Sequence, residues 1–211
     1  EIMPSLVGSE MCIRDSSYMT DKIRSLTMLH LHIIRYVESY DFKAQPDKPD
    51  SFSNNWKNNS LDDFILLNDD TELFKCKCQS VANYCFGDML PGDTVSYGDS
   101  IAAGDFTVRC FVPPRKFHGQ IHAITQTVDI DGQRIDHNAM QTTKGGYQTG
   151  RWLIHDRFSF SKGADTTYAW SAGCFILSSK DLEDFNQTLK AHDVQAGDEI
   201  VGTLSVQGSV I

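Results

Sequence analysis

The chain has 211 residues, of which 40% are hydrophobic and 22% are charged, and its formal net charge is -9. This length supports one hydrophobic core and is too short for two well-formed ones. The negative charge argues against a nucleic-acid-binding groove, because such proteins gather Lys and Arg on one face. No run of about 18 apolar residues is present, so the sequence predicts no membrane span.

The beginning of the chain differs from the rest. Residues 4–16, Pro-Ser-Leu-Val-Gly-Ser-Glu-Met-Cys-Ile-Arg-Asp-Ser, have no helical or strand period and lack the layout of a signal peptide. They resemble the translated adapter sequence that contaminates the ends of assembled sequencing reads, and a disordered natural leader is the alternative. We therefore expect residues 1–18 to lie outside a single domain over 28–207. On the adapter interpretation the natural N-terminus, with any signal peptide, is missing.

Most of the remaining segments predict β-structure, with about six or seven strands. Residues 29–34 alternate between two faces, which is the period of a strand. Residues 41–60 are polar and contain prolines and several asparagines, so we expect a long surface loop. The later predicted strands are 64–67 and 73–78, joined by a turn at 68–70, then 105–112, 121–130 with a hairpin turn at 131–132, the short run 152–155 after a Gly-rich loop at 145–150, and 199–206.

One helix is expected, near the C-terminus. Leu182, Phe185 and Leu189 recur at helical spacing, and Ser179 is placed to cap the helix N-terminus. Acidic residues follow Ser179 and Lys190 lies near the other end, which suits the helix dipole. The expected fold class is therefore mainly β with one helix.

The cysteines leave several pairings open. Apart from Cys12 in the leader, the chain has five, an odd number, as expected where one thiol stays free. Cys76 and Cys78 would share one face of a strand, and their spacing does not match the paired cysteines of structural zinc sites. Buried thiols, or a disulfide to Cys85, are the preferred interpretation, with the pairing of Cys110 also open. No metal and no other cofactor is expected.

Cys174 has the surroundings of a nucleophile. Gly173 permits a tight backbone path that can turn main-chain N–H groups toward a reacting oxygen, and Ser171 leaves room for a substrate. A thiol with a pKa near 8.5 needs a neighbouring base to act near neutral pH. His155, at the end of a predicted strand, could be that base. The alternative is that Cys174 is a buried core thiol and His155 a core histidine.

The spacing from His155 to Ser171-Ala-Gly-Cys174 resembles the signature of the L,D-transpeptidase (YkuD-like) family, a histidine followed at similar distance by Ser/Thr-His-Gly-Cys. The chain would be a divergent variant with a Trp-Ser-Ala-Gly-Cys core. Residues 100–108 also resemble a strand entry of related YkuD-like domains. The resemblance covers roughly residues 29–206, although only the site motif is specific. It implies a YkuD-like β-sandwich or barrel.

The resemblance also implies roles. Cys174 would attack a peptide carbonyl of a peptidoglycan stem peptide to form a thioacyl enzyme, and His155 would take and return the proton. The main-chain carbonyl or the side chain of Asp156 would orient the imidazole, and the main-chain N–H groups of Ala172, Gly173 and Cys174 would form the oxyanion hole. A periplasmic or cell-envelope location is implied. The residues expected to contact substrate are Ser171, Trp170, Arg151, Tyr168 and His118.

The sequence departs from the family signature at three places. Ala172 replaces a histidine, Phe175 and Ile176 replace polar residues, and Asp156 replaces a glycine. The second change removes a polar contact near the donor peptide, so hydrolysis stays open beside transfer to an amine. The alternatives are a cell-wall cysteine peptidase with the same Cys-His pair and an inactive YkuD-like structural or binding module.

Overall fold

The computed structural model describes residues 29–37, 39, 62–82, 100–113, 120–130, 133–137, 139–143, 145–149, 152–156, 171 and 173–208. The expected leader (1–18) and the expected surface loop (41–60) lie outside these residues. The strands are β1 (Leu29–Tyr36), β2 (Asp62–Asn68), β3 (Thr71–Cys78), β4 (Gly104–Val112), β5 (Ile121–Ile130), β6 (Gln133–His137), β7 (Ala139–Gln141), β8 (Tyr147–Thr149), β9 (Leu153–Asp156), β10 (Phe175–Leu177) and β11 (Glu199–Gln207), and the described helix is α3 (Ser179–Ala191).

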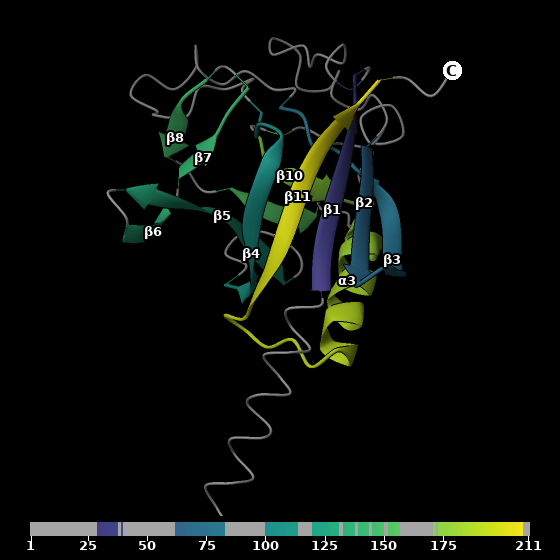
Figure 1. The fold of residues 1–211 in the computed structure, drawn as a ribbon. Helices are drawn as coiled ribbons and strands as arrows, with labels where there is room; N and C mark the ends of the chain where they lie inside the picture. The colour runs from purple at the N-terminus through teal and green to yellow at the C-terminus, as the bar shows by residue number, and fades with distance from the viewer. Residues whose placement is uncertain are drawn as a thin grey trace, which may run out of the picture.

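The main sheet curves into a nearly closed barrel (Figure 1). Its strand order is β10-β9-β5-β4-β11-β1-β2-β3, with β6 paired to β5, while β7 and β8 form a separate small sheet. The two outer strands meet just beyond β3, where Gln79 N donates to Ile176 O at 2.9 Å and Ile176 N donates to Gln79 O at 3.0 Å. This bridge brings β10, and the residues that precede it, next to the end of β3.

The core fills the inside of the barrel, as strand β1 illustrates. Leu29, Leu31 and Ile33 are buried and alternate with half-buried residues, which confirms the predicted period. β1 pairs parallel with β11 and antiparallel with β2. The predicted hairpin of β2 and β3 is also confirmed, with Asp69 at a φ of 51° in the turn. The alternation therefore identified which residues form the core of these strands.

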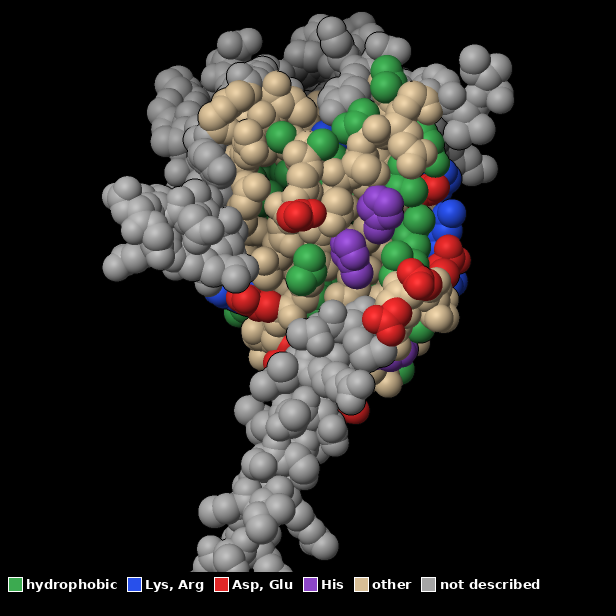
Figure 2. Space-filling view, in the orientation of Figure 1, with side chains coloured by type: hydrophobic (Ala, Val, Ile, Leu, Met, Phe, Trp, Pro, Cys, Tyr) green, Lys and Arg blue, Asp and Glu red, His purple; other side chains and the backbone are tan. Residues whose placement is uncertain are grey.

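The outer face of β1 and β11 carries a polar row. The Nε2 atoms of His30 and His32 lie 2.9 Å from Thr203 Oγ1 and 3.0 Å from Ser205 Oγ, and Thr203 Oγ1 donates to Asp105 Oδ1 at 2.8 Å. The two rings are neighbours, with centroids 6.4 Å apart, and histidine side chains lie on the face of the molecule seen in Figure 2. These contacts stabilise the pairing of β1, β11 and β4 on the outside of the barrel.

Helix α3 packs its apolar side against the barrel. Leu182, Phe185 and Leu189 are buried as predicted, and the Phe185 ring lies 4.9 Å from the Phe64 ring between centroids. The predicted cap was wrong by one residue, because Ser178 is the N-cap and its hydroxyl accepts from Asp181 N at 3.0 Å. α3 is too short and too polar to span a membrane.

The number of strands exceeds the six or seven expected. The described strands run from β1 to β11, and β7, β8 and β10 have three residues each, too few to show a period in the sequence. The expected Gly-rich loop contains the turn between β7 and β8, where Gly145 and Gly146 have φ values of 90° and 73°. The prediction of a mainly β fold with one helix near the C-terminus is confirmed, although the number of strands is larger than expected.

Candidate cysteine–histidine site

His155 lies on β9, and Cys174 directly precedes the neighbouring strand β10. β9 and β10 pair in parallel, with Ile176 opposite His155, and Cys174 directly precedes β10. Residues in register share a face of the sheet, and alternate residues along a strand share it too. His155 and Ile176 therefore share one face of the sheet, opposite to the face of Phe175 and Leu177, whereas Cys174 lies just outside β10 and packs against the hydrophobic core.

The main chain orients the His155 ring. His155 is 7% exposed, and its Nδ1 lies 2.6 Å from the carbonyl oxygen of Asp156. A carbonyl oxygen only accepts hydrogen bonds, so Nδ1 carries the hydrogen and Nε2 is the basic nitrogen of the neutral ring. A histidine held in this tautomer can take a proton at Nε2.

The Asp156 side chain points away from the imidazole. Asp156 is fully buried, and its Oδ2 accepts a hydrogen bond of 2.9 Å from the hydroxyl of Ser179, the first residue of α3. Of the two Asp156 oxygens expected to orient His155, the carbonyl one makes the contact. The side chain instead ties the end of β9 to the N-terminus of the helix, a contact that a glycine at this position would lack.

Ser171 stabilises the backbone that precedes Cys174 through two hydrogen bonds. Its hydroxyl donates to Cys174 O at 2.8 Å and accepts from Gly173 N at 3.0 Å, and Gly173 has a φ of 122°, a conformation that favours glycine. The Gly173 N–H, expected among the oxyanion-hole donors, is thus engaged inside the loop. Ser171 is only 2% exposed, so its described contacts support Cys174 rather than a substrate.

The described cysteines differ in burial. Cys174 and Cys76 are half-buried, and Cys78 and Cys110 are buried. Burial raises the pKa of Cys76 and of Cys78, and it raises the pKa of Cys110 to about 12. Cys76, Cys78 and Cys110 are free thiols, so the interpretation as buried thiols holds and the alternative of a disulfide from Cys76 or Cys78 to Cys85 was wrong. Burial disfavours their thiolate forms, so we expect none of the three to act as a nucleophile.

The remaining expected contacts fall on residues that the structure does not describe. These are His118, Arg151, Tyr168, Trp170 and Ala172. No group of three or more His, Cys, Asp or Glu side chains that could hold a metal ion occurs in the described ranges. A cavity of about 450 Å³ lies beside α3 and is lined by Asp156, Ser179 and Asn186 among others, but His155 and Cys174 are not among its described lining residues.

A second histidine, His122, is a core residue. It is fully buried, its Nδ1 accepts from Phe111 N at 3.2 Å, and its Nε2 lies 2.7 Å from Asn186 Oδ1. Burial lowers its pKa to about 4, against a partly opposing hydrogen bond to Asn186. His122 is therefore a neutral residue that joins β4, β5 and α3.

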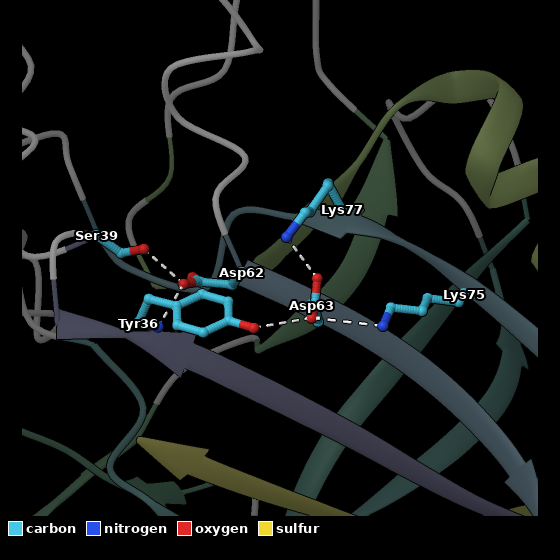
Figure 3. Close-up of polar contacts among 6 residues, drawn as sticks. All are labelled: Tyr36, Ser39, Asp62, Asp63, Lys75 and Lys77. Atoms are coloured by element: carbon cyan, nitrogen blue, oxygen red, sulfur yellow. Dashed lines mark hydrogen bonds and ion pairs between the residues drawn. The ribbon is translucent and has the colours of Figure 1, made fainter. Parts of the chain in front are cut away.

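A buried polar network lies at the end of the barrel where β10 begins. Asp62 is fully buried and its carboxylate accepts from Tyr36 N at 2.9 Å, Ser39 Oγ at 2.5 Å and Ser80 Oγ at 2.6 Å (Figure 3 shows Asp62 with Tyr36 and Ser39). Arg35, also fully buried, donates through Nε to Ser80 Oγ at 2.8 Å and through Nη2 to Ser80 O at 2.6 Å. Ser80 follows Gln79, so this network holds the bridge to Ile176 in place.

The neighbouring carboxylate, Asp63, faces outward. It accepts from Lys77 Nζ at 2.6 Å and from the Tyr36 hydroxyl at 3.0 Å, and Lys75 Nζ lies 3.7 Å away (Figure 3). Partial burial would raise the pKa of Asp63, but the hydrogen bonds from Lys77 and Tyr36 lower it below its ordinary value. The two adjacent acidic residues therefore have different partners. Asp62 accepts hydrogen bonds inside the barrel, whereas Asp63 contacts lysine side chains on its outer side.

Sequence reasoning missed Gln79. It is 2% exposed and pairs with Ile176, the residue that also lies in register with His155. It follows the predicted strand 73–78 with no motif around it, and its pairing partner is far away in the sequence. No local signal could have placed it beside the candidate site.

Comparison with known proteins identifies a relative. No protein-family model matches the sequence, and no solved structure matches it. A protein of Treponema pallidum (strain Nichols), named only as an uncharacterized protein, is 50% identical over 194 residues, which cover 90% of this chain and 87% of that protein. The chain therefore belongs to the same family as this Treponema pallidum protein.

Proposed function

We propose that the protein is a cysteine acyltransferase that resembles the L,D-transpeptidases and acts on peptidoglycan stem peptides through a thioacyl enzyme. The observation that supports this best is the Nδ1 contact of His155 with Asp156 O, at 2.6 Å, on the strand next to Cys174. That contact makes Nε2 the basic nitrogen. A base of this kind, on a strand that pairs with the one directly after a half-buried thiol, suits general-base activation of that thiol.

The proposed reaction begins with transfer of the Cys174 thiol proton to His155 Nε2. The sulfur then forms a bond to a peptide carbonyl carbon, and the carbonyl oxygen takes the negative charge of the tetrahedral intermediate. Collapse of the intermediate breaks the carbon–nitrogen bond, and His155 gives its proton to the departing amine. The product of this half is a thioester between Cys174 and the acyl group of the donor.

The second half releases the acyl group. An amine or a water molecule gives a proton to His155 and attacks the thioester carbonyl, after which the Cys174 thiolate leaves and regains the proton. Phe175 and Ile176 are 0% and 1% exposed. Side chains this buried offer no polar contact to an amine, an observation that favours hydrolysis as the second candidate outcome.

A thiol-labelling experiment tests the Cys-His pair without knowledge of the substrate. At pH 7, Cys174 should react with iodoacetamide about tenfold faster than a free thiol of pKa near 8.5, because the paired base favours the thiolate. His155→Ala should remove that advantage, while Cys110→Ser, as a matched control, should leave the Cys174 rate unchanged. Peptide mapping separates the cysteines. A Cys174 that labels no faster than a free thiol and ignores the loss of His155 would favour the structural-module alternative.

A second experiment tests the substrate class. The protein is incubated with a muropeptide or a carbapenem, and its intact mass is measured. A covalent adduct on the wild type that is absent from Cys174→Ser supports the thioacyl enzyme. Adding an amine acceptor then distinguishes transfer, which yields a cross-linked peptide, from hydrolysis, which yields the free acid.

A further inference from the structure

Gln79 holds a buried amide oxygen that lacks a partner. The side chain is 2% exposed, and its Nε2 donates to Val81 O at 3.0 Å, but Oε1 has no hydrogen-bond partner among the residues that the structure describes. Exchanging the two amide atoms would not help, because Oε1 would then face the carbonyl oxygen of Val81. Buried polar atoms are nearly always hydrogen-bonded, so an unpaired acceptor in a candidate site indicates a missing donor.

The pairing of the strands places the Gln79 side chain on the same face of the sheet as His155. Ile176 pairs with Gln79 on one side and with His155 on the other, so the three residues form one row across the sheet with their side chains on the same face. Cys174 is two residues before Ile176 and directly precedes β10. Diagonal neighbours of paired strands have Cα atoms about 7–8 Å apart, within reach of a side chain as long as glutamine.

The backbone of Gln79 is held rigidly at this place. Both of its main-chain hydrogen bonds go to Ile176, and the next residue, Ser80, is bonded by Arg35 and Asp62. Arg35 and Asp62 are fully buried. A group that contributes to specificity must keep its position in the free protein, and this network supplies that constraint.

The chemistry of the missing donor follows from the proposed reaction. A peptide acyl group bound to the Cys174 sulfur has its own backbone N–H two bonds from the thioester carbonyl carbon. We propose that Gln79 Oε1 accepts a hydrogen bond from this N–H, an inference that rests on the proposed function. Gln79 is then a specificity-determining residue that selects acyl groups with an N–H on the carbon next to the reacting carbonyl, as in peptides, over acyl groups that lack it.

Two thioesters test this on the full chain. One is the S-benzyl thioester of N-acetylglycine, and the other is that of acetoxyacetic acid, in which an ester oxygen replaces the N–H. The rate of Cys174 acylation is measured by intact mass and divided by the rate with N-acetylcysteine, which corrects for the reactivity of each compound. The wild type should prefer the N–H compound by about tenfold, because the ester leaves Oε1 unpaired.

Gln79→Met provides the matched variant, since methionine has similar length and no acceptor. Its preference between the two thioesters should fall to about one. The rate of Cys174 labelling by methyl methanethiosulfonate, which has no N–H, should change less than about twofold, which shows that the thiol itself is intact. Gln79→Asn keeps the amide but withdraws it by one methylene, and should lose most of the preference as well.

The outcomes separate this inference from the proposed function. If wild-type Cys174 is acylated by neither thioester, both the proposed function and the role of Gln79 are overturned. If it is acylated by both at equal corrected rates, or if Gln79→Met keeps the wild-type preference, the role of Gln79 is overturned and the acyl-enzyme chemistry stands. The wild-type comparison needs no substitution, so a variant that fails to fold does not prevent the test.

Discussion

Two histidines of the barrel differ in what their Nδ1 atoms contact, and this decides what each can do. Nδ1 of His155 faces a carbonyl oxygen and must carry a hydrogen, whereas Nδ1 of His122 accepts from a main-chain N–H and must lack one. Nε2 is therefore basic in His155 and a donor to Asn186 in His122. The burial and contacts of His122 predict a measurable effect on stability.

The expected effect is a loss of stability at low pH. The pKa of His122 is lowered by burial from 6.5 to about 4 in the folded protein. Between these values the unfolded chain binds a proton that the folded protein does not, so the free energy of unfolding falls as pH falls from 6.5 to about 4 and levels off below. The size is about 3 kcal/mol.

His122→Gln is the control for this prediction, because glutamine can make both hydrogen bonds and does not titrate. The free energy of unfolding is measured by urea titration at pH 4 and pH 7 for both proteins. The wild type should lose about 3 kcal/mol more than the variant over this interval. Parallel pH dependence in the two proteins would show that folding does not lower the pKa of His122.

At the scale of elements, the pairing of β11 with β4 depends on a glycine. Gly202 lies opposite Phe106, and a Cβ atom at Gly202 would lie 2.2 Å from the Phe106 ring. Gly202→Ala should therefore lower the free energy of unfolding by about 1–3 kcal/mol through overpacking. Phe106→Leu frees part of that space, so the double variant should lose less than the two single losses together. Strict additivity, measured by urea titration, would contradict the steric explanation.

The start of α3 gives a second prediction at this scale. Ser178 caps the helix by accepting from Asp181 N, although the sequence pattern had favoured Ser179. Ser178→Ala should lower the free energy of unfolding by about 1 kcal/mol, whereas Ser178→Asp should retain most of it because aspartate also caps well. Thermal or urea unfolding measures both. An equal loss in the two variants would mean that the cap contributes little.

At the scale of the whole molecule, barrel closure depends on the buried network around Ser80. Arg35→Met leaves the fully buried Asp62 without the charge that lies across Ser80 from it. Removing one partner of such a pair should lower the free energy of unfolding by about 3–5 kcal/mol. The hydrogen bond from Ile176 N to Gln79 O should also open more often, which amide hydrogen exchange detects.

Lys77→Met is the matched control for this prediction. Lys77 contacts Asp63 at 2.6 Å, but its side chain is 55% exposed, so its loss should cost less than about 1 kcal/mol and leave exchange at Ile176 unchanged. Similar effects of the two substitutions would contradict a role of the buried network in closing the barrel.

The elements whose burial has a visible period could be predicted from the sequence. Strand β1, the hairpin of β2 and β3, strands β4, β5 and β11 and the apolar side of α3 are all apparent as alternation or helical spacing, because one side of each faces the core. The sequence also identified Cys174 and His155 as candidates, because the small residues next to Cys174 and the strand that ends at His155 are visible in the local sequence.

The way in which these parts come together could not be predicted from the sequence. The bridge between Gln79 and Ile176, the buried Arg35 and Asp62 around Ser80, and the choice of the Asp156 carbonyl as the partner of His155 all depend on main-chain groups or on residues distant in the sequence. Almost every residue type has the same main-chain donor and acceptor, so the sequence pattern does not predict which main-chain hydrogen bonds form. Strand pairing brings these groups together.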